Sequence, residues 1–274
     1  MTRQNYYKGR LLRQGLSVDE RLVLDLVHVE RCRQPRLGSR KLLRMLSGDL
    51  ASAGVSIGRD RFFELLRRHK LLIRRRRGAA RTTDSAHGFR TYSNLAKDLE
   101  LTGPHQLLVS DITYIRTEEG FMYLSLVMDA YSRAIVGYDC SDSLEMEGAL
   151  RALKRALKQL PAGVTTMHHS DRGSQYCCGA YIGRLREAGL VISMTEANHC
   201  SENAKAERLN GIMKQEYGLG ETFARKGMVI SAVREGVMLY NHYRPHTALG
   251  YRMPMEVHQL GMAGSAATAV ASEA

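Results

Sequence analysis

The order of apolar patterns after about Gln106 constrains the fold of this chain most. Three strand candidates at close spacing favour an antiparallel meander: LLVSDITYI, FMYLSLVMDA and RAIVGYDC. We then expect a helix at residues 144–160, a strand at 164–169, a helix at 174–188, a short strand at 190–193 and a helix that carries Glu207. Three strands followed by alternating helix and strand predict an α/β fold, a ribonuclease H-like mixed sheet with flanking helices.

Three acidic residues stand out in this pattern. Asp111 interrupts the first apolar run, and Asp171 follows the strand expected at 164–169. Glu207 shares one face of its helix with Asn203 and Asn210, at i−4 and i+3. An acid beside a core is costly unless a cation meets it. Carboxylates on two strands and a helix could converge to hold divalent metals, which activate water or a 3′-hydroxyl for attack on a phosphodiester.

Each acid also has a purely structural interpretation. Asp111 could cap a turn, Asp171 could begin a helix, and Glu207 could pair with Arg208 or Lys214 at the surface. The joint occurrence of all three in matching contexts favours a shared site. A fourth acid, Asp129, is followed by Ala-Tyr-Ser, which favours a structural cap over a ligand.

The first 75 residues are predicted to form a small all-α domain. Helices are expected up to about residue 33, at 39–50 and at 58–69. Short helices with small-residue turns and basic faces are typical of a helix-turn-helix-like DNA-binding unit. A basic linker at 76–104 would join it to a core at 105–258, and the small-residue segment 259–274 is predicted to be a disordered tail.

The positive charge of the chain is concentrated in this first third. Residues 1–100 hold 23 Lys/Arg and 10 Asp/Glu, whereas the rest of the chain has a balance of −1. DNA is the expected partner, since phosphate neutralisation releases counterions; the alternative for any single basic run is a solvated face. Candidate DNA contacts are Arg59, Arg61, Arg74, Arg75, Arg76 and Arg77, and near the acids Arg172, Gln175 and Lys214.

Other classes of protein are disfavoured. No apolar stretch approaches the roughly 18 residues of a membrane span, and the N-terminus lacks the apolar segment of a secretory signal. The five cysteines form no CxxC pair, and no Cys/His cluster has the spacing of a structural zinc site. An odd number of cysteines without the spacing of a disulfide framework indicates reduced thiols and a cytoplasmic location.

Several strings carry a specific resemblance. They include RLGSRKLL, SDITYI, SRAIVGY, HSDRGSQY, SENAKAERLNGIMKQEY and YNHYRPHTALGYRMP, and 35 residues separate Asp171 from Glu207. The chain resembles the second-reading-frame transposases of the bacterial insertion-sequence-three family, relatives of retroviral integrases. It departs from them in having no tryptophan and in carrying Glu202-Asn203 where Asp-Asn is usual.

The resemblance implies a DDE transposase with a retroviral integrase-type core. Asp111, Asp171 and Glu207 would bind Mg²⁺ or Mn²⁺, with two ions expected. The substrates would be the terminal inverted repeats of the element and its target DNA, cut and joined by a homo-oligomer in the bacterial nucleoid. An upstream-frame protein, free or fused by frameshifting, is a further expected partner. From this resemblance, the Asn241–His246 segment is expected to pack against the core or to contact DNA rather than to take part in catalysis.

Two rival functions remain open from the sequence. The first is a nuclease of the same superfamily that never joins DNA. The second is a non-catalytic DNA-binding remnant that acts as a repressor.

Overall fold

The computed structural model describes residues 19–73, 88–196 and 203–272. The chain divides into two compact units, Met1–Arg77 and Gly78–Ala274, and each is considered by itself. No helix in the described ranges is long and apolar enough to cross a membrane. The run Arg74–Arg77 lies outside the described residues.

The first unit is helical, as predicted. A helix covers residues 19–33, followed by α2 (Ser39–Ser52) and α3 (Arg59–Arg68). Between α2 and α3 the chain turns at Gly54, which has a φ of 72° and therefore needs glycine's conformational freedom. The helices enclose one apolar cluster that includes Val27, Leu42, Phe62 and Leu65.

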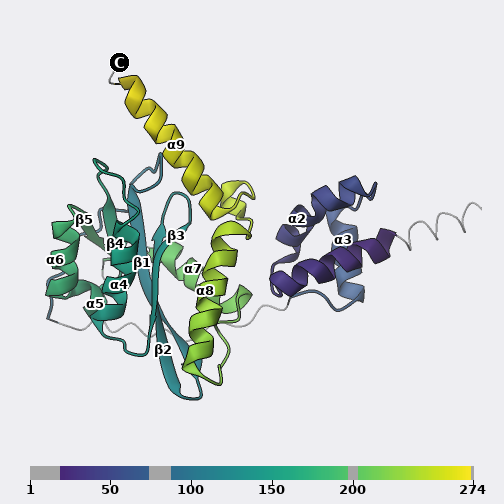
Figure 1. The fold of residues 1–274 in the computed structure, drawn as a ribbon, viewed down its shortest axis with the longest axis horizontal. Helices are drawn as coiled ribbons and strands as arrows, with labels where there is room; N and C mark the ends of the chain where they lie inside the picture. The colour runs from purple at the N-terminus through teal and green to yellow at the C-terminus, as the bar shows by residue number, and fades with distance from the viewer. Residues whose placement is uncertain (1–18, 74–87, 197–202, 273–274) are drawn as a thin grey trace, which may run out of the picture. The chain divides into compact units, whose positions relative to one another are not determined.

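The second unit is built on a five-stranded mixed sheet, as predicted (Figure 1). The strand order is β3-β2-β1-β4-β5. Strands β1 (Leu107–Thr117), β2 (Gly120–Asp129) and β3 (Ile135–Ser141) form an antiparallel meander. Strands β4 (Met167–Ser170) and β5 (Val191–Met194) extend the sheet in parallel beyond β1. Crossover helices are needed to join parallel neighbours, which explains the change from hairpins to helix–strand alternation.

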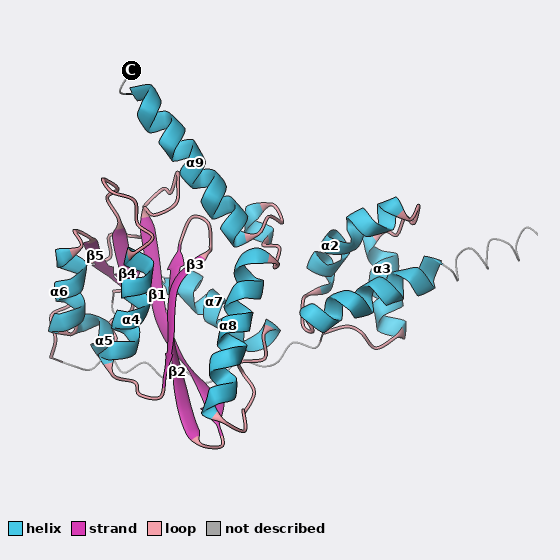
Figure 2. Cartoon of the chain, viewed as in Figure 1, coloured by secondary structure: helices cyan, strands magenta, loops and turns pink. Residues whose placement is uncertain are grey.

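Helices cover both faces of this sheet (Figure 2). One face packs on α4 (Met146–Leu157), α5 (Ser174–Cys177) and α6 (Gly179–Glu187). The other packs on α7 (Ala204–Glu216) and α8 (Lys226–His242). A short 3₁₀ helix, Thr247–Leu249, and α9 (Pro254–Ser272) complete the unit. Alternate residues of β1 therefore enter two different cores, with Val109 on the α7 side and Leu108 on the α4 side.

Three expectations need correction. The helix expected at 174–188 is two helices, because Cys178 adopts an extended conformation (φ −66°, ψ 148°) between α5 and α6. Part of the expected linker packs on the sheet, since the Leu95 amide donates to Ser193 Oγ at 2.9 Å. The expected disordered tail is largely helical, because α9 continues to Ser272 through an alanine-rich segment of high helix propensity.

Candidate active site

Asp111 and Asp171 lie side by side because of how β1 pairs with β4. The parallel register pairs Ser110 of β1 with Ser170, the last residue of β4. The residue that follows each of these serines is an aspartate. Neighbouring strands are about 4.8 Å apart. Both carboxylates line one cavity of about 520 Å³. Its other lining residues are Ile112, Tyr114, Arg116, Phe121, Tyr123, Leu144, Gly173, Ser174, Gln175 and Tyr176.

The Asp111 carboxylate accepts two hydrogen bonds. The Ile112 amide donates to Oδ1 at 2.9 Å, and Asn210 Nδ2 donates to Oδ2 at 2.8 Å. Burial nevertheless raises the pKa of Asp111 to about 7, and the negative charges of Asp171 and Glu207 add to this effect. Burial and the two neighbouring acids thus make the charged form of Asp111 costly, and a bound cation would lower that cost.

Asp171 is held by the turn that follows it. The Gly173 amide donates to Asp171 Oδ1 at 3.0 Å. A Cβ atom at Gly173 would lie 3.0 Å from the same oxygen, so glycine permits this close approach. Gly173 is also the N-cap of α5, so the turn that holds Asp171 leads directly into that helix.

Helix α7 places Glu207 on the face that meets β1. Asn203 Nδ2 donates to the Ser110 carbonyl at 3.2 Å, and Asn210 binds Asp111. Glu207 lies between these two asparagines on the same helical face and is exposed. Its charge reaches Asp111 and contributes to the raised pKa.

The three acids do not lie close enough together, as placed in the structure, to form a complete set of metal ligands. The described ranges contain no group of three or more His, Cys, Asp or Glu side chains placed to hold a metal ion. The structure therefore brings Asp111 and Asp171 together and leaves Glu207 nearby. The segment directly before α7, residues 197–202, lies outside the described residues.

Lys214 also points toward this site. Its ammonium nitrogen lies 4.5 Å from the centre of the Tyr114 ring, in cation–π contact. Burial lowers the pKa of Lys214, while the charge of Asp111 opposes that shift. Lys214 is therefore a half-buried cation in contact with Tyr114, which lines the cavity.

The other predicted contact residues are more dispersed. Gln175 lines the cavity and donates to the Leu144 carbonyl at 3.0 Å, whereas Arg172 is half-buried beside Asp171. In the first unit, Arg59 pairs with Asp60 at 2.8 Å and Arg61 lies 3.6 Å from Glu20. Both of these arginines are exposed, so neither is committed to packing.

A buried histidine supports the site from behind. His168 Nε2 is 2.8 Å from Ser110 Oγ and 3.0 Å from the Tyr181 hydroxyl. Complete burial, followed by the charge of His169, lowers the pKa of His168 to about 3. The His168 contacts join β4 to the residue before Asp111. The sequence reasoning missed this role, although the HHS string directly before Asp171 was the available signal.

Asp129 has the structural role that its sequence context favours. It is fully buried and accepts hydrogen bonds from the amides of His105, at 2.6 Å, and Ser132, at 2.7 Å. The Ser132 hydroxyl lies 2.9 Å from Nδ1 of His258, which comes from α9. Asp129 therefore organises a turn and the docking of α9, away from the cavity.

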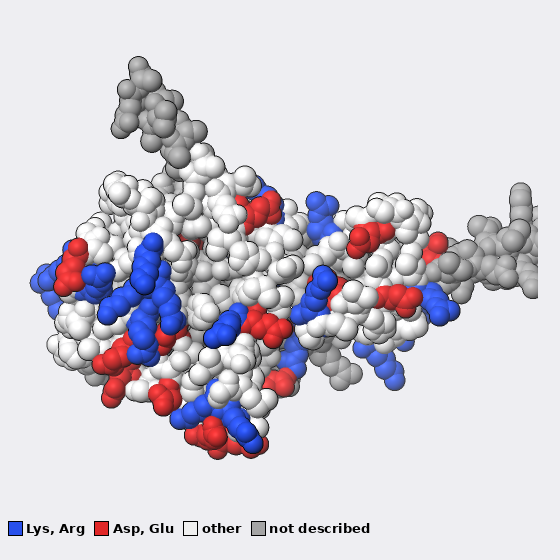
Figure 3. All heavy atoms as spheres, viewed as in Figure 1, with Lys and Arg blue, Asp and Glu red and all other residues white. Residues whose placement is uncertain are grey.

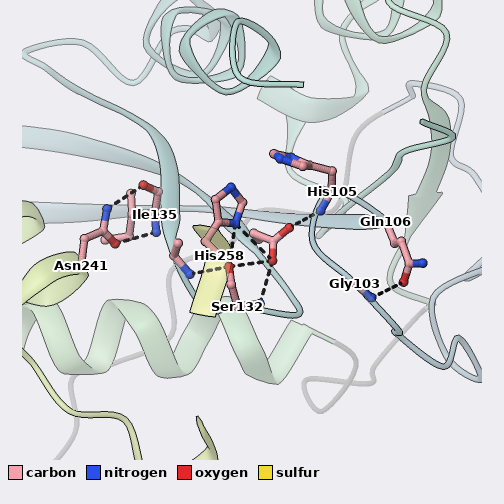
Figure 4. Close-up of polar contacts among 9 residues, drawn as sticks. Gly103, His105, Gln106, Ser132, Ile135, Asn241 and His258 are labelled. Carbon is pink, nitrogen blue, oxygen red and sulfur yellow. Dashed lines mark hydrogen bonds and ion pairs between the residues drawn. The ribbon is translucent and has the colours of Figure 1, made fainter. Parts of the chain in front are cut away.

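The Asn241–His246 segment packs, as expected. Asn241 both donates to and accepts from the backbone of Ile135, at 2.9 Å each (Figure 4). Arg244 forms a two-pronged ion pair with Glu216, with nitrogen–oxygen distances of 2.7 and 2.8 Å. These contacts tie α8 to β3 and to the end of α7.

The chain is similar to known proteins over most of its length. A family model described as integrase core domain matches residues 102–200, and a second with the same description matches residues 188–254. A 31 kDa protein of insertion element IS600 from Shigella sonnei is 35% identical over 240 residues, which cover 86% of each chain. The InsF transposase of insertion sequence IS3A from Escherichia coli K12 is 31% identical over 220 residues, covering 80% of this chain and 76% of its own.

A solved structure extends the comparison to the fold. A chain of the simian T-cell lymphotropic virus intasome, in complex with PP2A regulatory subunit B56 gamma, has a TM-score of 0.50 at 14% identity. The match covers 81% of this chain and 70% of that one.

Proposed function

Because this chain belongs to the insertion-sequence-three family of transposases and is itself a DNA transposase, we propose that Asp111, Asp171 and Glu207 are its catalytic carboxylates. The polynucleotidyl transfer that the family performs requires a site that stabilises charge on a phosphodiester. The observation that carries the proposal is the β1–β4 register, which sets two of these acids next to each other at one cavity.

The donor set fits divalent magnesium, or manganese in its place. Magnesium prefers hard oxygen ligands and needs only a few carboxylates together with substrate phosphates and waters. The pKa of Asp111 is raised by burial and by two neighbouring acids, and a cation would relieve all of these costs. We propose that two ions bind and that Asp111, Asp171 and Glu207 would hold them.

The protein supplies position as well as charge. A bound divalent ion supplies Lewis acidity, which makes a water or a 3′-hydroxyl a better nucleophile and stabilises the leaving oxygen. Asn210 holds the Asp111 carboxylate in one orientation, and Asn203 holds α7 against β1. Glu207 lies between them along α7, and its exposed side chain is proposed as the third ligand.

The cavity walls suit a nucleic-acid strand. Aromatic rings of Tyr114, Phe121 and Tyr123 line it, and bases stack on such surfaces. We assign Lys214 and Gln175, together with Arg172, to contacts with the strand that carries the scissile phosphate. The contact of Lys214 with Tyr114, and its position seven residues after Glu207 on the same face of α7, support this assignment.

The helical first unit is proposed to bind the DNA outside the active site. Arg59 and Arg61, which are exposed, would contact phosphates there, and the same role is proposed for Arg74–Arg77 from their sequence. Basic side chains position a protein on a duplex without reading its sequence. Transposases act on DNA as oligomers. The terminal inverted repeats, the target duplex and an upstream-frame protein are the partners proposed for this chain.

The test is a set of conservative substitutions that remove charge and keep shape. Asp111→Asn, Asp171→Asn and Glu207→Gln should each abolish cleavage and joining of labelled terminal-repeat DNA in Mg²⁺, by at least 10³-fold. DNA binding in EDTA should change little. Glu235→Gln, on the exposed face of α8, is the matched control and should retain activity.

The products separate this proposal from its rivals. A joined product requires strand transfer, whereas a nuclease yields only cut ends. A Glu207→Gln variant that joins DNA at a rate near that of the unmodified protein would remove Glu207 from the assignment.

A further inference from the structure

The outer surface of α4 is strongly basic, although residues 101–274 as a whole are nearly neutral. From Arg151 to Arg186 the sequence holds seven Lys/Arg and a single acid, Asp171. Four of these basic residues follow one another on α4 and its C-cap at i, i+3, i+4 and i+7: Arg151, Lys154, Arg155 and Lys158. Figure 3 shows basic side chains gathered over α4. We call these four residues the α4 ridge.

The ridge faces away from the core. The opposite side of α4 buries Ala149, Ala152, Leu153 and Ala156 against the sheet. All four ridge residues are exposed. The helix is therefore amphipathic, and its charged side is presented to whatever lies outside the unit.

The two arginines of the ridge are held in place. Arg151 donates to Asp139 Oδ2 from Nε at 3.0 Å and from Nη2 at 2.8 Å. Arg155 lies 3.1 Å from Asp139 Oδ1 and stacks over the Tyr138 ring at 5.7 Å. Asp139 is itself buried and supplies one negative charge against two positive ones. Guanidinium groups held in this way lose little further freedom when they bind a phosphate.

The two lysines of the ridge have no ion-pair partner among the described residues. In the described part of the chain, no acidic side chain lies within ion-pair distance of Lys154 or Lys158. Their separation along the helix is roughly 6 Å, at 1.5 Å per residue. The ridge spans about 10 Å, a length over which a DNA duplex presents about six phosphate charges.

The ridge is separate from the candidate active site. Leu144 lines the active-site cavity, and two exposed acids, Glu145 and Glu147, follow it before the ridge begins at Arg151. These acids would repel a phosphate backbone running directly from the cavity onto α4. A strand held in the cavity and a backbone on the ridge are therefore two different stretches of DNA.

We propose that the α4 ridge binds the phosphate backbone of a second DNA duplex, distinct from the strand whose phosphate lies at Asp111, and does so without reading its sequence. This inference depends on one part of the proposed function, namely that the substrate is DNA. Lysine and arginine contacts to phosphate fix the position of a duplex and carry no base information. The ridge would hold such a duplex while the cavity acts on another.

The experiment measures the salt dependence of DNA binding by the full chain. The double variant Lys154→Gln/Lys158→Gln is compared with Lys97→Gln/Arg234→Gln, a control that removes the same charge from exposed positions elsewhere in the unit. The ligand is a duplex of unrelated sequence in EDTA. Loss of two phosphate contacts should make the slope of log K against log salt shallower by about 1.8, whereas the control slope should stay at the value of the unmodified chain.

An unchanged slope for the ridge variant would overturn the proposal and leave an acidic protein partner as the better occupant. Lys154→Arg/Lys158→Arg should keep the original slope, which excludes an effect of misfolding. Failure of the proposed function is seen separately. If the unmodified chain neither cuts nor joins terminal-repeat DNA in Mg²⁺, the catalytic assignment fails, but the slopes measured in EDTA still decide the ridge.

Discussion

Replacing Arg244 with methionine should destabilise the larger unit more than any surface change. The Arg244 side chain is 2% exposed, and its partner Glu216 is 16% exposed. Burial alone would lower the pKa of Arg244, but the hydrogen bonds and charge of Glu216 outweigh it and raise that pKa. Arg244→Met keeps most of the side-chain volume and removes from the Glu216 carboxylate the cation that pairs with both of its oxygens.

The expected cost is about 3–5 kcal/mol, the range found when one partner of a buried ion pair is removed. Removal of both charges should cost far less, because no uncompensated charge is left behind. The double variant Arg244→Met/Glu216→Gln should therefore lie within about 1–2 kcal/mol of the unmodified protein.

The measurement is urea unfolding followed by far-ultraviolet circular dichroism. With a denaturant slope of about 2–3 kcal/mol/M, the single variant should unfold at a urea concentration roughly 1–2.5 M lower. If Arg244→Met cost less than about 1 kcal/mol, or if the double variant were no more stable than the single one, the ion pair would not hold α7 to α8 as described.

The remaining predictions concern the support of the sheet. The pKa of His168 is about 3 in the folded protein and near 6.5 in the unfolded chain. Between these two values the unfolded chain binds one more proton than the folded protein does. The free energy of unfolding therefore falls as the pH falls through this range. The stability difference between the unmodified protein and His168→Phe should therefore shrink by about 2 kcal/mol from pH 6.5 to pH 5, at about 1.4 kcal/mol per unit; a constant difference in urea titrations would refute it. Gly137→Ala should destabilise by several kcal/mol, because its Cβ would lie 2.2 Å from the Ala152 carbonyl oxygen, whereas Gly183→Ala, inside α6 with open space around it, should stabilise by about 0.5–1 kcal/mol. Thermal unfolding of both glycine variants checks this pair, and equal effects would contradict it.

Much of the fold could be predicted from local patterns. The apolar, β-prone runs LLVSDITYI and FMYLSLVMDA predict β1 and β2, and the helical spacing of apolar residues predicts α4 and α7. These patterns are reliable because they reflect which face of a single element is buried, a property of neighbouring residues. The break between α5 and α6 at Cys178 was not predicted, because its one local signal is Gly179, and a single glycine also occurs inside helices.

The candidate site was predictable in its residues and less so in its geometry. The acids and the asparagines around Glu207 could be recognised from their spacing. Their contacts could not: Asn210 reaches Asp111 and Asn203 reaches the Ser110 carbonyl only because α7 docks across β1. His258 likewise meets the Asp129 turn from a segment expected to end the core.

The sequence alone determined which residues carry charge, which faces of each strand and helix are apolar, and that the family is one of transposases. Only the tertiary structure decided that Asp111 and Asp171 share a cavity, that Glu207 stands exposed beside them, and that the α4 ridge faces outward. The reason is that apolar periodicity describes each element separately. Distances between elements follow from the long-range pairing of β1 with β4 and from the packing of helices on opposite faces of one sheet.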